Sequence, residues 1–562
     1  MSNVAPFLIF FIGAGLAAVS RGPLRSVLLL AIPVVGAANL AAMGEGSFAQ
    51  FELFNYTLTL IRVDKLSFLF GLLFHLAAFL AIVFSLHVQD RLQIVCGLLY
   101  AGSALGAVFA GDLITLFVFW EILAVSSVGM ILARREKNSN STALRYLIIQ
   151  VLSGVILLAG IMVRVQETGS IAFEHIELAG LGSWLMLLAI GIKCGFPLLH
   201  NWLPDAYPEA TPTGTVFLSA FTTKVAVYAL ARAFEGADIL IYVGALMTFF
   251  PIFFAVIEND LRRVLSYSMI NQIGFMVCGI GIGTSLAVNG AVSHAFNDVI
   301  FKGLLFMSMG AVLLRTGTTK ASELGGLYKS MPWTTGFCMV GAASISAFPL
   351  FSGFVSKSMV MVAALEEGQP WIWLILLFAS AGVLEHAGIK IPYFAFFAHD
   401  SGKRPKEAPR NMLIAMGLAA VICIFNGVYP WVLYNLLPYP VTYEPYTLDH
   451  VVTQIQLLLF ASLGVAVLMQ AKVYPPEIPS VNLDADIIYR KGLPYIAALI
   501  RSLCARAYAH TFGAMQAWFG RALSGIYRHH GPHGILARSW PTGSMVFWTT
   551  VLLGVYLIVY FI

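Results

Sequence analysis

Long apolar stretches follow one another almost from end to end, and they limit what this chain can fold into more than any other feature. A helix that crosses the hydrocarbon core of a bilayer needs about 20 mostly apolar residues. The sequence therefore predicts an all-α polytopic membrane protein with about 14–16 transmembrane helices. We expect these spans at residues 4–20, 24–43, 66–86, 91–110, 112–133, 143–164, 184–203, 213–234, 237–257, 261–282, 284–314, 332–355, 371–397, 411–437, 451–471 and 545–562.

Composition excludes several other classes of protein. Only 11% of the 562 residues are charged, whereas soluble domains carry about 25%. The net charge of +5 is small and no basic block is present, which argues against nucleic-acid binding. The six cysteines form no CxxC pair and no Fe–S or haem spacing, so we expect no cofactor, no metal and no enzymatic activity.

The pattern of spans divides the chain into four predicted parts. Residues 1–90 should form N-terminal transmembrane helices with a short extraplasmic hairpin at 48–63, the first helix being a span rather than a removable signal. Two half-repeats are expected, and C-terminal helices should follow them. The ranges are 91–234 for the first half-repeat, 237–397 for the second, and 411–562 for the C-terminal helices with a cytoplasmic interfacial segment at 472–544.

Within that last segment, residues 494–530 repeat arginines among Ile, Leu, Phe and Trp. This pattern is typical of an interfacial helix whose arginines reach toward the membrane surface. A lateral arm that clamps a partner subunit is the alternative. Lys and Arg gather in the loops after predicted spans 1, 5, 9, 11 and 13, which places both termini outside.

Ionisable residues recur inside the predicted spans. Each one costs roughly 2.5–3.5 kcal/mol at mid-bilayer on insertion scales. One pair could be a structural salt bridge, but a series running through successive spans indicates a proton relay. Histidine titrates near neutral pH, and a buried lysine can be brought close to it. The predicted relay residues are Glu121, Lys193, His200, Lys224, His294, Asp298, Lys302, Lys357 and Lys390, with Glu385 and His386 nearby.

Helix breakers stand beside two of these lysines. Pro197 follows Lys193, while Pro349 and Gly353 precede Lys357. Proline removes a backbone hydrogen bond, which inside a bilayer is tolerated only against protein or a water-filled cavity. The two breaks lie five spans apart. This spacing predicts inverted repeats, spans 4–8 and 9–13, each with one discontinuous helix.

Five strings of residues resemble the antiporter-like proton-conducting subunits shared by Mrp-type Na⁺/H⁺ antiporters, respiratory complex I and membrane-bound hydrogenases. They occur in the family's order over roughly residues 60–400. The strings are FWEILAVSSVGMIL (119–132), FPLLHNWLPDAYPEATPTGTV (196–216), ENDLRRVLSYSMINQIGFM (258–276), HAFNDVIFKGLLF (294–306) and FPLFSGFVSK (348–357).

The resemblance implies a role for several residues. Glu121 would be the acid paired with the broken-helix lysine, Lys193, and Lys224 the connecting lysine of the next helix. His294 would be the central histidine, and Lys357 the terminal lysine of the second broken helix. Asp298 departs from the pattern, since many relatives carry histidine or an apolar residue there, and lysine at 357 occurs in only some branches.

The predicted function is that of an Mrp D-like, proton-translocating subunit of a Na⁺/proton antiporter in the bacterial inner membrane. Its partners would be other membrane subunits, protons, Na⁺ and the lipid bilayer. Alternatives are an ion-pumping subunit of a complex I-like or hydrogenase-type redox complex, the membrane subunit of an inorganic-carbon uptake system, and an inert scaffold that retains the fold. The coupled ion cannot be read from the sequence.

Overall fold

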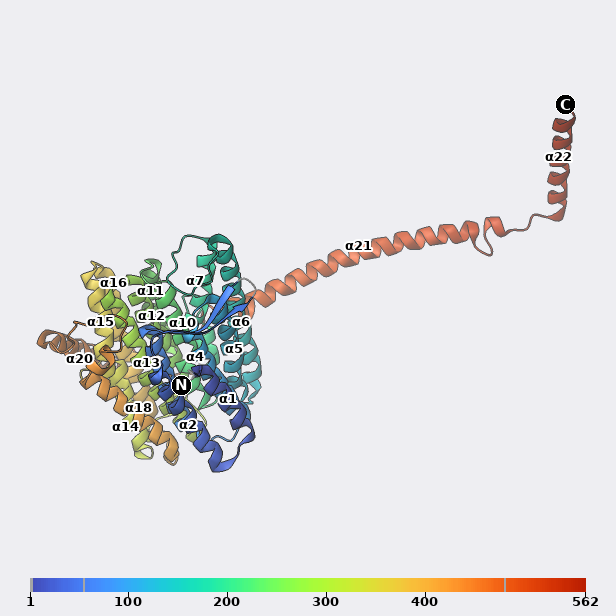
Figure 1. Ribbon diagram of the computed structural model, residues 1–562. Helices are drawn as coiled ribbons and strands as arrows, with labels where there is room; N and C mark the ends of the chain where they lie inside the picture. Colours follow the sequence, from blue (N-terminus) through green and yellow to red (C-terminus); the bar gives the residue numbers. More distant parts are fainter. Residues whose placement is uncertain (1–3, 54–55, 480–481) are drawn as a thin grey trace. The chain divides into compact units, whose positions relative to one another are not determined.

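The computed structural model describes residues 4–53, 56–479 and 482–562, and nearly all of its elements are helices (Figure 1). In this part of the chain 13 helices are long and apolar enough to cross a membrane. Two shorter apolar helices, Pro6–Val19 and Leu181–Cys194, are found in the same part of the chain. The predicted all-α polytopic fold is therefore confirmed. Residues up to Asn482 form one compact unit and Leu483–Ile562 a second.

A β-hairpin interrupts the N-terminal helices. Its strands are antiparallel, with Gly46 opposite Val63 and Leu53 opposite Tyr56, which confirms the predicted hairpin apart from residues 54–55, which lie outside the described residues. The Thr59 amide donates to the carboxylate of Asp112, so the hairpin is tied to the start of α5. The N-terminal elements are α1 (Pro6–Val19), α2 (Gly22–Ala42), β1 (Gly46–Leu53), β2 (Tyr56–Val63) and α3 (Lys65–Ser85).

Two successive sets of helices follow, and each set crosses the bundle five times. The first set is α4 (Arg91–Phe109), α5 (Leu113–Leu132), α6 (Lys137–Thr168), α7 (Leu181–Cys194) with α8 (Trp202–Ala206), and α9 (Gly214–Ala220) with α10 (Thr222–Ala233). The second set is α11 (Ile239–Ile257), α12 (Leu261–Ile282), α13 (Ser285–Thr316), η1 (Ala321–Glu323), η2 (Leu327–Lys329), α14 (Pro332–Ile345) with α15 (Ser352–Glu366), and α16 (Pro370–Val383), η3 (Leu384–Ile389), α17 (Lys390–Pro392) and η4 (Tyr393–Phe397).

The two sets repeat one another in detail. Helices α6 and α13 both have 32 residues, and α7 and α14 both have 14. Asp112 caps α5 and forms an isolated β-bridge with Ala172, while Asp260 caps α12 and forms the same kind of bridge with Lys320. Because five crossings is an odd number, the second set starts on the opposite side of the membrane from the first, as an inverted repeat requires.

Each repeat contains one helix broken at the same short motif. The backbone is left-handed at Gly195 (φ 79°) and Leu198 (φ 69°) in the first break, and at Ala347 (φ 57°) and Leu350 (φ 73°) in the second. Phe-Pro-Leu occupies residues 196–198 and 348–350. A left-handed residue other than glycine costs roughly 1–2 kcal/mol, so these breaks persist only because their surroundings impose them. The predicted pair of discontinuous helices is confirmed.

Further helices complete the first unit, and the second unit holds the remaining ones. Helix α18 contacts both α3 and α13, which closes the bundle around the second repeat. The predicted helix at 494–530 is confirmed as α21, whose 38 residues include none that is buried. These elements are α18 (Arg410–Val428), α19 (Trp431–Tyr434), α20 (Leu448–Gln470), η5 (Ile488–Gly492), α21 (Leu493–His530), η6 (Ile535–Ala537) and α22 (Thr542–Phe561).

Several predicted boundaries need correction. The expected span 213–234 is two helices that meet at Phe221 (φ −106°, ψ −66°), and residues 215–234 contain no proline or glycine to signal an interruption. The expected span 371–397 turns from α-helix to π-helix at Leu384. The expected span 411–437 ends at Val428 and continues as the short helix α19.

Gly353 lets the two halves of the second broken helix approach closely, because a Cβ there would collide with the Ser344 carbonyl oxygen. We expect Gly353→Ala to lower the free energy of unfolding by about 1–3 kcal/mol, since backbone rather than a flexible side chain must move. Thermal unfolding in detergent measures this effect. Gly336→Ala is the matched control, because nothing lies within 4 Å of a Cβ at that helical position. Equal melting temperatures for the two variants would contradict the close approach.

Candidate functional site

The ionisable residues predicted as a relay lie inside the helix bundle. Their buried positions exclude water from most of the series, so each charge must be stabilised by a protein group. Glu121 is half-buried. The others are buried, with exposed fractions of 0% for Lys193, Lys224, His294, Asp298 and Lys302, 1% for Lys357 and Lys390, and 2% for His200.

Lys193 stands in the last turn of α7, just before the first helix break. Its ammonium donates to the Trp120 carbonyl at 2.7 Å and lies 4.4 Å from the centre of the Trp120 ring. The structure thus places Trp120, rather than the expected Glu121, in direct contact with Lys193. Glu121 remains close enough to interact with Lys193 through space. The absence of a side chain at Gly154 on α6 leaves room for its carboxylate.

Lys224 and Asp298 form an ion pair at 2.6 Å, and both side chains are fully buried. Lys224 belongs to α10 of the first repeat and Asp298 to α13 of the second. Asp298, the residue that departs from the family pattern, is therefore the counter-ion of Lys224. This pair joins the charges of one repeat to those of the other.

His294 and Lys302 flank Asp298 on the same helix, as their spacing predicts. The two ring nitrogens of His294 hydrogen-bond the side chains of Ser356 and Gln272, at 3.0 and 3.1 Å. Lys302 donates to the Ser268 hydroxyl at 2.8 Å. The three groups of α13 therefore face α10, α12 and α15 and connect four helices. Sequence reasoning missed the polar partners, which are ordinary Ser and Gln residues in apolar runs.

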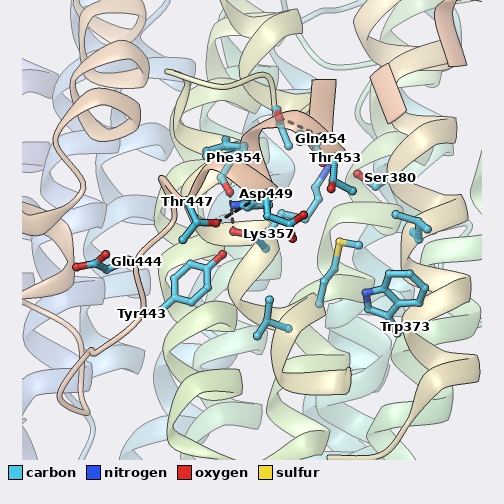
Figure 2. Close-up of a pocket in the computed structure, with 16 residues that line it drawn as sticks. Phe354, Lys357, Trp373, Ser380, Tyr443, Glu444, Thr447, Asp449, Thr453 and Gln454 are labelled. Carbon is cyan, nitrogen blue, oxygen red and sulfur yellow. Dashed lines mark hydrogen bonds between the residues drawn. The ribbon is translucent and has the colours of Figure 1, made fainter. Parts of the chain in front are cut away.

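Lys357 lies beside a cavity of about 340 Å³ (Figure 2). Its ammonium donates to the Ile345 carbonyl across the second helix break, at 3.0 Å. The cavity is lined by α15 and α16 and by polar residues of the chain before and within α20, among them Tyr443, Asp449 and His450. A water molecule occupies about 30 Å³ in the liquid, so the cavity has room for several. Lys357 thus lies beside a cavity whose lining contains both polar and apolar side chains.

Lys390 and His200 are the remaining predicted residues. Lys390 begins the short helix α17, directly after the π-helical stretch η3, and donates to the carbonyls of Val256 and Glu258, at 2.6 and 2.8 Å. It also forms an ion pair with Glu477 at 2.8 Å. No sequence signal indicated Glu477, an acid in a proline-rich loop. His200 lies in the first helix break, its ring centre 4.6 Å from that of Phe250.

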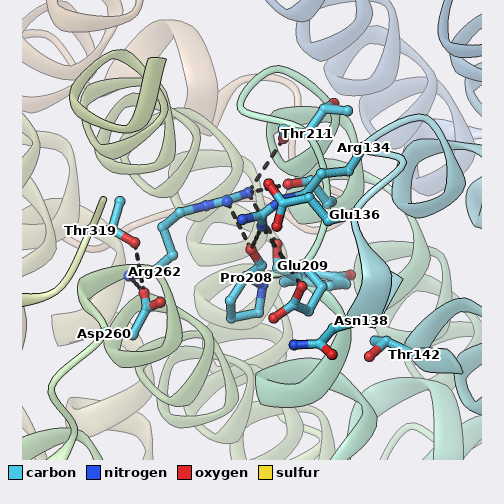
Figure 3. Close-up of polar contacts among 12 residues, drawn as sticks. Arg134, Glu136, Asn138, Thr142, Pro208, Glu209, Thr211, Asp260, Arg262 and Thr319 are labelled. Atoms are coloured by element: carbon cyan, nitrogen blue, oxygen red, sulfur yellow. Dashed lines mark hydrogen bonds and ion pairs between the residues drawn. The ribbon is translucent and has the colours of Figure 1, made fainter. Parts of the chain in front are cut away.

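A buried arginine fixes the loop that follows the first broken helix. Arg262 of α12 points its guanidinium at residues 207–215 (Figure 3). It donates to the carbonyls of Pro208 at 2.8 Å, Tyr207 at 3.2 Å, Ala210 at 3.0 Å and Thr211 at 3.3 Å, and also to the Thr215 hydroxyl. These contacts give a physical reason for the string DAYPEATPTG, whose irregular backbone could not otherwise be buried.

We expect Arg262→Ala to lower the free energy of unfolding by roughly 3–5 kcal/mol, because the carbonyls lose a buried charged donor. Arg262→Lys should lie between the alanine variant and wild type, since an ammonium cannot reach all of these acceptors at once. Unfolding of the detergent-solubilised protein measures both variants. Arg91→Ala, at an exposed arginine, is the control. An Arg262→Ala protein as stable as this control would show that the loop does not depend on Arg262.

Comparison with known proteins confirms the resemblance seen in the five strings. Residues 110–382 match the family described as NADH:quinone oxidoreductase/Mrp antiporter, transmembrane. The chain is 28% identical over 415 residues to hydrogenase-4 component B of Escherichia coli, covering 62% of this chain and 61% of that protein. It is 31% identical over 278 residues to the D subunit of the Na⁺/H⁺ antiporter of Alkalihalophilus pseudofirmus, covering 46% of this chain and 56% of that protein.

Both alignments therefore span about six tenths of the relative's length. Among solved structures, a chain of the membrane-bound sulfane sulfur reductase, an archaeal respiratory membrane complex, has a TM-score of 0.71. It is 22% identical, and the match covers 99% of both chains. At this identity the likeness establishes the fold, which includes the C-terminal helices.

Proposed function

Because residues 110–382 are related to antiporter-like membrane subunits, we propose that this chain is the proton-translocating subunit of a multisubunit Na⁺/proton antiporter. Protons move through the mid-membrane series of Glu, Lys and His side chains, and the chain itself is a transporter rather than an enzyme. It resides as a multi-pass protein in a bacterial inner membrane. The coupled reaction is the exchange of protons for Na⁺ across that membrane.

One observation carries the proposal: the buried ion pair between Lys224 and Asp298. An acid beside a lysine holds that lysine in its charged form, and weakening the pair favours release of the lysine's proton. Since the two residues belong to different repeats, a charge displacement in one repeat is felt in the other. Glu121 and Lys193 precede this pair in the series, and Lys302, His294 and Lys357 follow it.

Other membrane subunits are part of the proposal. The relatives are named as a component of hydrogenase-4 and as one of the subunits of an antiporter, which indicates that such chains work in assemblies. Helix α21 has no buried residue within its own unit and carries Arg501, Arg506, Arg521 and Arg528. We expect it to lie at the membrane interface and to clamp a neighbouring subunit.

A second candidate is an ion-pumping subunit of a hydrogenase-type or complex I-like redox complex. One observation favours it. The likeness to the sulfane sulfur reductase chain extends over the C-terminal helices. In this case the same relay moves protons, and electron transfer in partner subunits supplies the energy.

The purified complex in proteoliposomes with a pH-sensitive dye separates these two functions. An antiporter moves protons when a Na⁺ gradient is imposed, whereas a redox-driven pump requires an electron donor. In either case Asp298→Asn should reduce proton flux roughly 100-fold, because Lys224 loses its counter-ion. Asp238→Asn, at an exposed aspartate, should leave the flux unchanged. Wild-type flux in Asp298→Asn would refute the relay.

Lys357 tests whether the residue beside the cavity releases a proton. Arginine keeps the charge but stays protonated in proteins, whereas alanine removes the charge. If proton release matters, both Lys357→Arg and Lys357→Ala should stop transport in the same proteoliposomes. An arginine variant that behaves like wild type across the pH range would exclude a titrating role for Lys357 and leave it as a fixed charge.

A further inference from the structure

The chain that leaves α20 inserts one carboxylate into the membrane-spanning unit. This strap, residues 474–479, reads Tyr-Pro-Pro-Glu-Ile-Pro. Pro476, Ile478 and Pro479 are exposed, yet the Glu477 side chain between them is only 6% exposed. A loop normally exposes its acids and buries its apolar side chains. The reversed pattern means that a specific interaction holds Glu477 inside.

That interaction is with the relay. Glu477 lies 2.8 Å from the ammonium of Lys390. The strap is docked on both sides of this pair: the Tyr474 hydroxyl donates to the Glu385 carboxylate at 2.6 Å, and the Asn482 amide donates to the Glu258 carboxylate at 3.1 Å. Glu385 belongs to the π-helical stretch η3 after α16, and Lys390 follows this stretch directly as the first residue of α17. Such stretches are rare and frequently occur at functional sites.

The geometry at Lys390 suits a proton transfer. An ammonium has three N–H donors, and its neighbours offer three acceptors: the Val256 and Glu258 carbonyls and the Glu477 carboxylate. If the third proton moves to Glu477, the remaining amine has two N–H groups for the two carbonyls and a lone pair facing the new O–H. The Val256 and Glu258 carbonyls therefore keep their N–H donors in both protonation states.

The other ionisable groups around the pair are on three elements. Arg263 at the start of α12 lies 3.8 Å from Glu258, while Glu385 and His386 lie in the π-helical stretch η3 that directly precedes Lys390. His386 also interacts through space with Lys302 of α13 and with Lys390. His386 is thus near both Lys302 and Lys390. Burial raises the pKa of the Glu477 carboxyl, and the charge of Lys390 opposes this shift.

We propose that Glu477 is a further member of the proton relay and takes the proton from Lys390. This inference rests on the proton-translocating function proposed above. In the step, an N–H bond of the Lys390 ammonium breaks and an O–H bond forms on Glu477, so that an ammonium and a carboxylate become an amine and a carboxylic acid. The acid then loses its proton to water beside the exposed strap. Lys390 regains a proton from the direction of Lys302 and His386.

Two measurements test this role. In proteoliposomes that contain the whole complex, Glu477→Gln should lower proton flux roughly 100-fold, because glutamine keeps the size and polarity of the side chain but cannot titrate. Glu477→Asp should retain flux with a displaced pH profile. Glu367→Gln, at an exposed acid between α15 and α16, is the matched control. Wild-type flux in Glu477→Gln would overturn the proposal.

The second measurement does not depend on transport. Infrared titration of the purified full chain should show a carboxylic-acid band that is lost in Glu477→Gln and whose midpoint shifts in Lys390→Met. If the wild-type protein moves no protons but shows this band, the proposed transport function is wrong, while the proton exchange between Lys390 and Glu477 is still supported. No such band between about pH 5 and pH 9 would overturn the proposal. Loss of proton flux in both Glu477→Gln and Glu477→Asp, together with lower melting temperatures for both variants, would also overturn the proposal.

Discussion

The ion pair between Lys224 and Asp298 is the interaction on which the rest of the site depends. Each of these charges alone would be too costly to bury, and together they compensate one another. Because one charge comes from α10 and the other from α13, the pair fixes how the two repeats meet. It also fixes the rotation of α13, and thereby directs His294 toward Gln272 and Lys302 toward Ser268.

The repeats are similar in backbone and different in charge. Gly154 and Lys302 occupy the same position in the two 32-residue helices α6 and α13. Trp120 and Ser268, which accept from Lys193 and Lys302, likewise occupy the same position in α5 and α12. In the first repeat the glycine leaves space that the Glu121 carboxylate uses. In the second a lysine fills that space. Glu121 in the first repeat and Lys302 in the second therefore make the two ends of the series chemically different, which two identical repeats would not do.

Much of the fold could be predicted from the sequence, because in a bilayer an apolar run and a helix coincide. The hairpin, the two broken helices and the predicted spans other than 213–234, 371–397 and 411–437 are confirmed, and the ionisable residues were found because charge is costly there. Contacts between helices could not be predicted, because hydropathy carries no information on helix rotation. Trp120 therefore escaped notice as the partner of Lys193, as did Glu477, whose surroundings resemble any surface loop. The interruption at Phe221 arises from tertiary packing and leaves no local signal.

The bonds of Arg262 also bear on how much this protein can move. Many transporters with inverted repeats work by alternating access, in which one repeat rocks against the other around a fixed site. Here Arg262 of the second repeat donates hydrogen bonds to four backbone carbonyls of the first repeat. Rocking would break all of these bonds together around a buried guanidinium. The scaffold is therefore rigid, and the moving parts are side chains, water molecules and protons within a stationary frame.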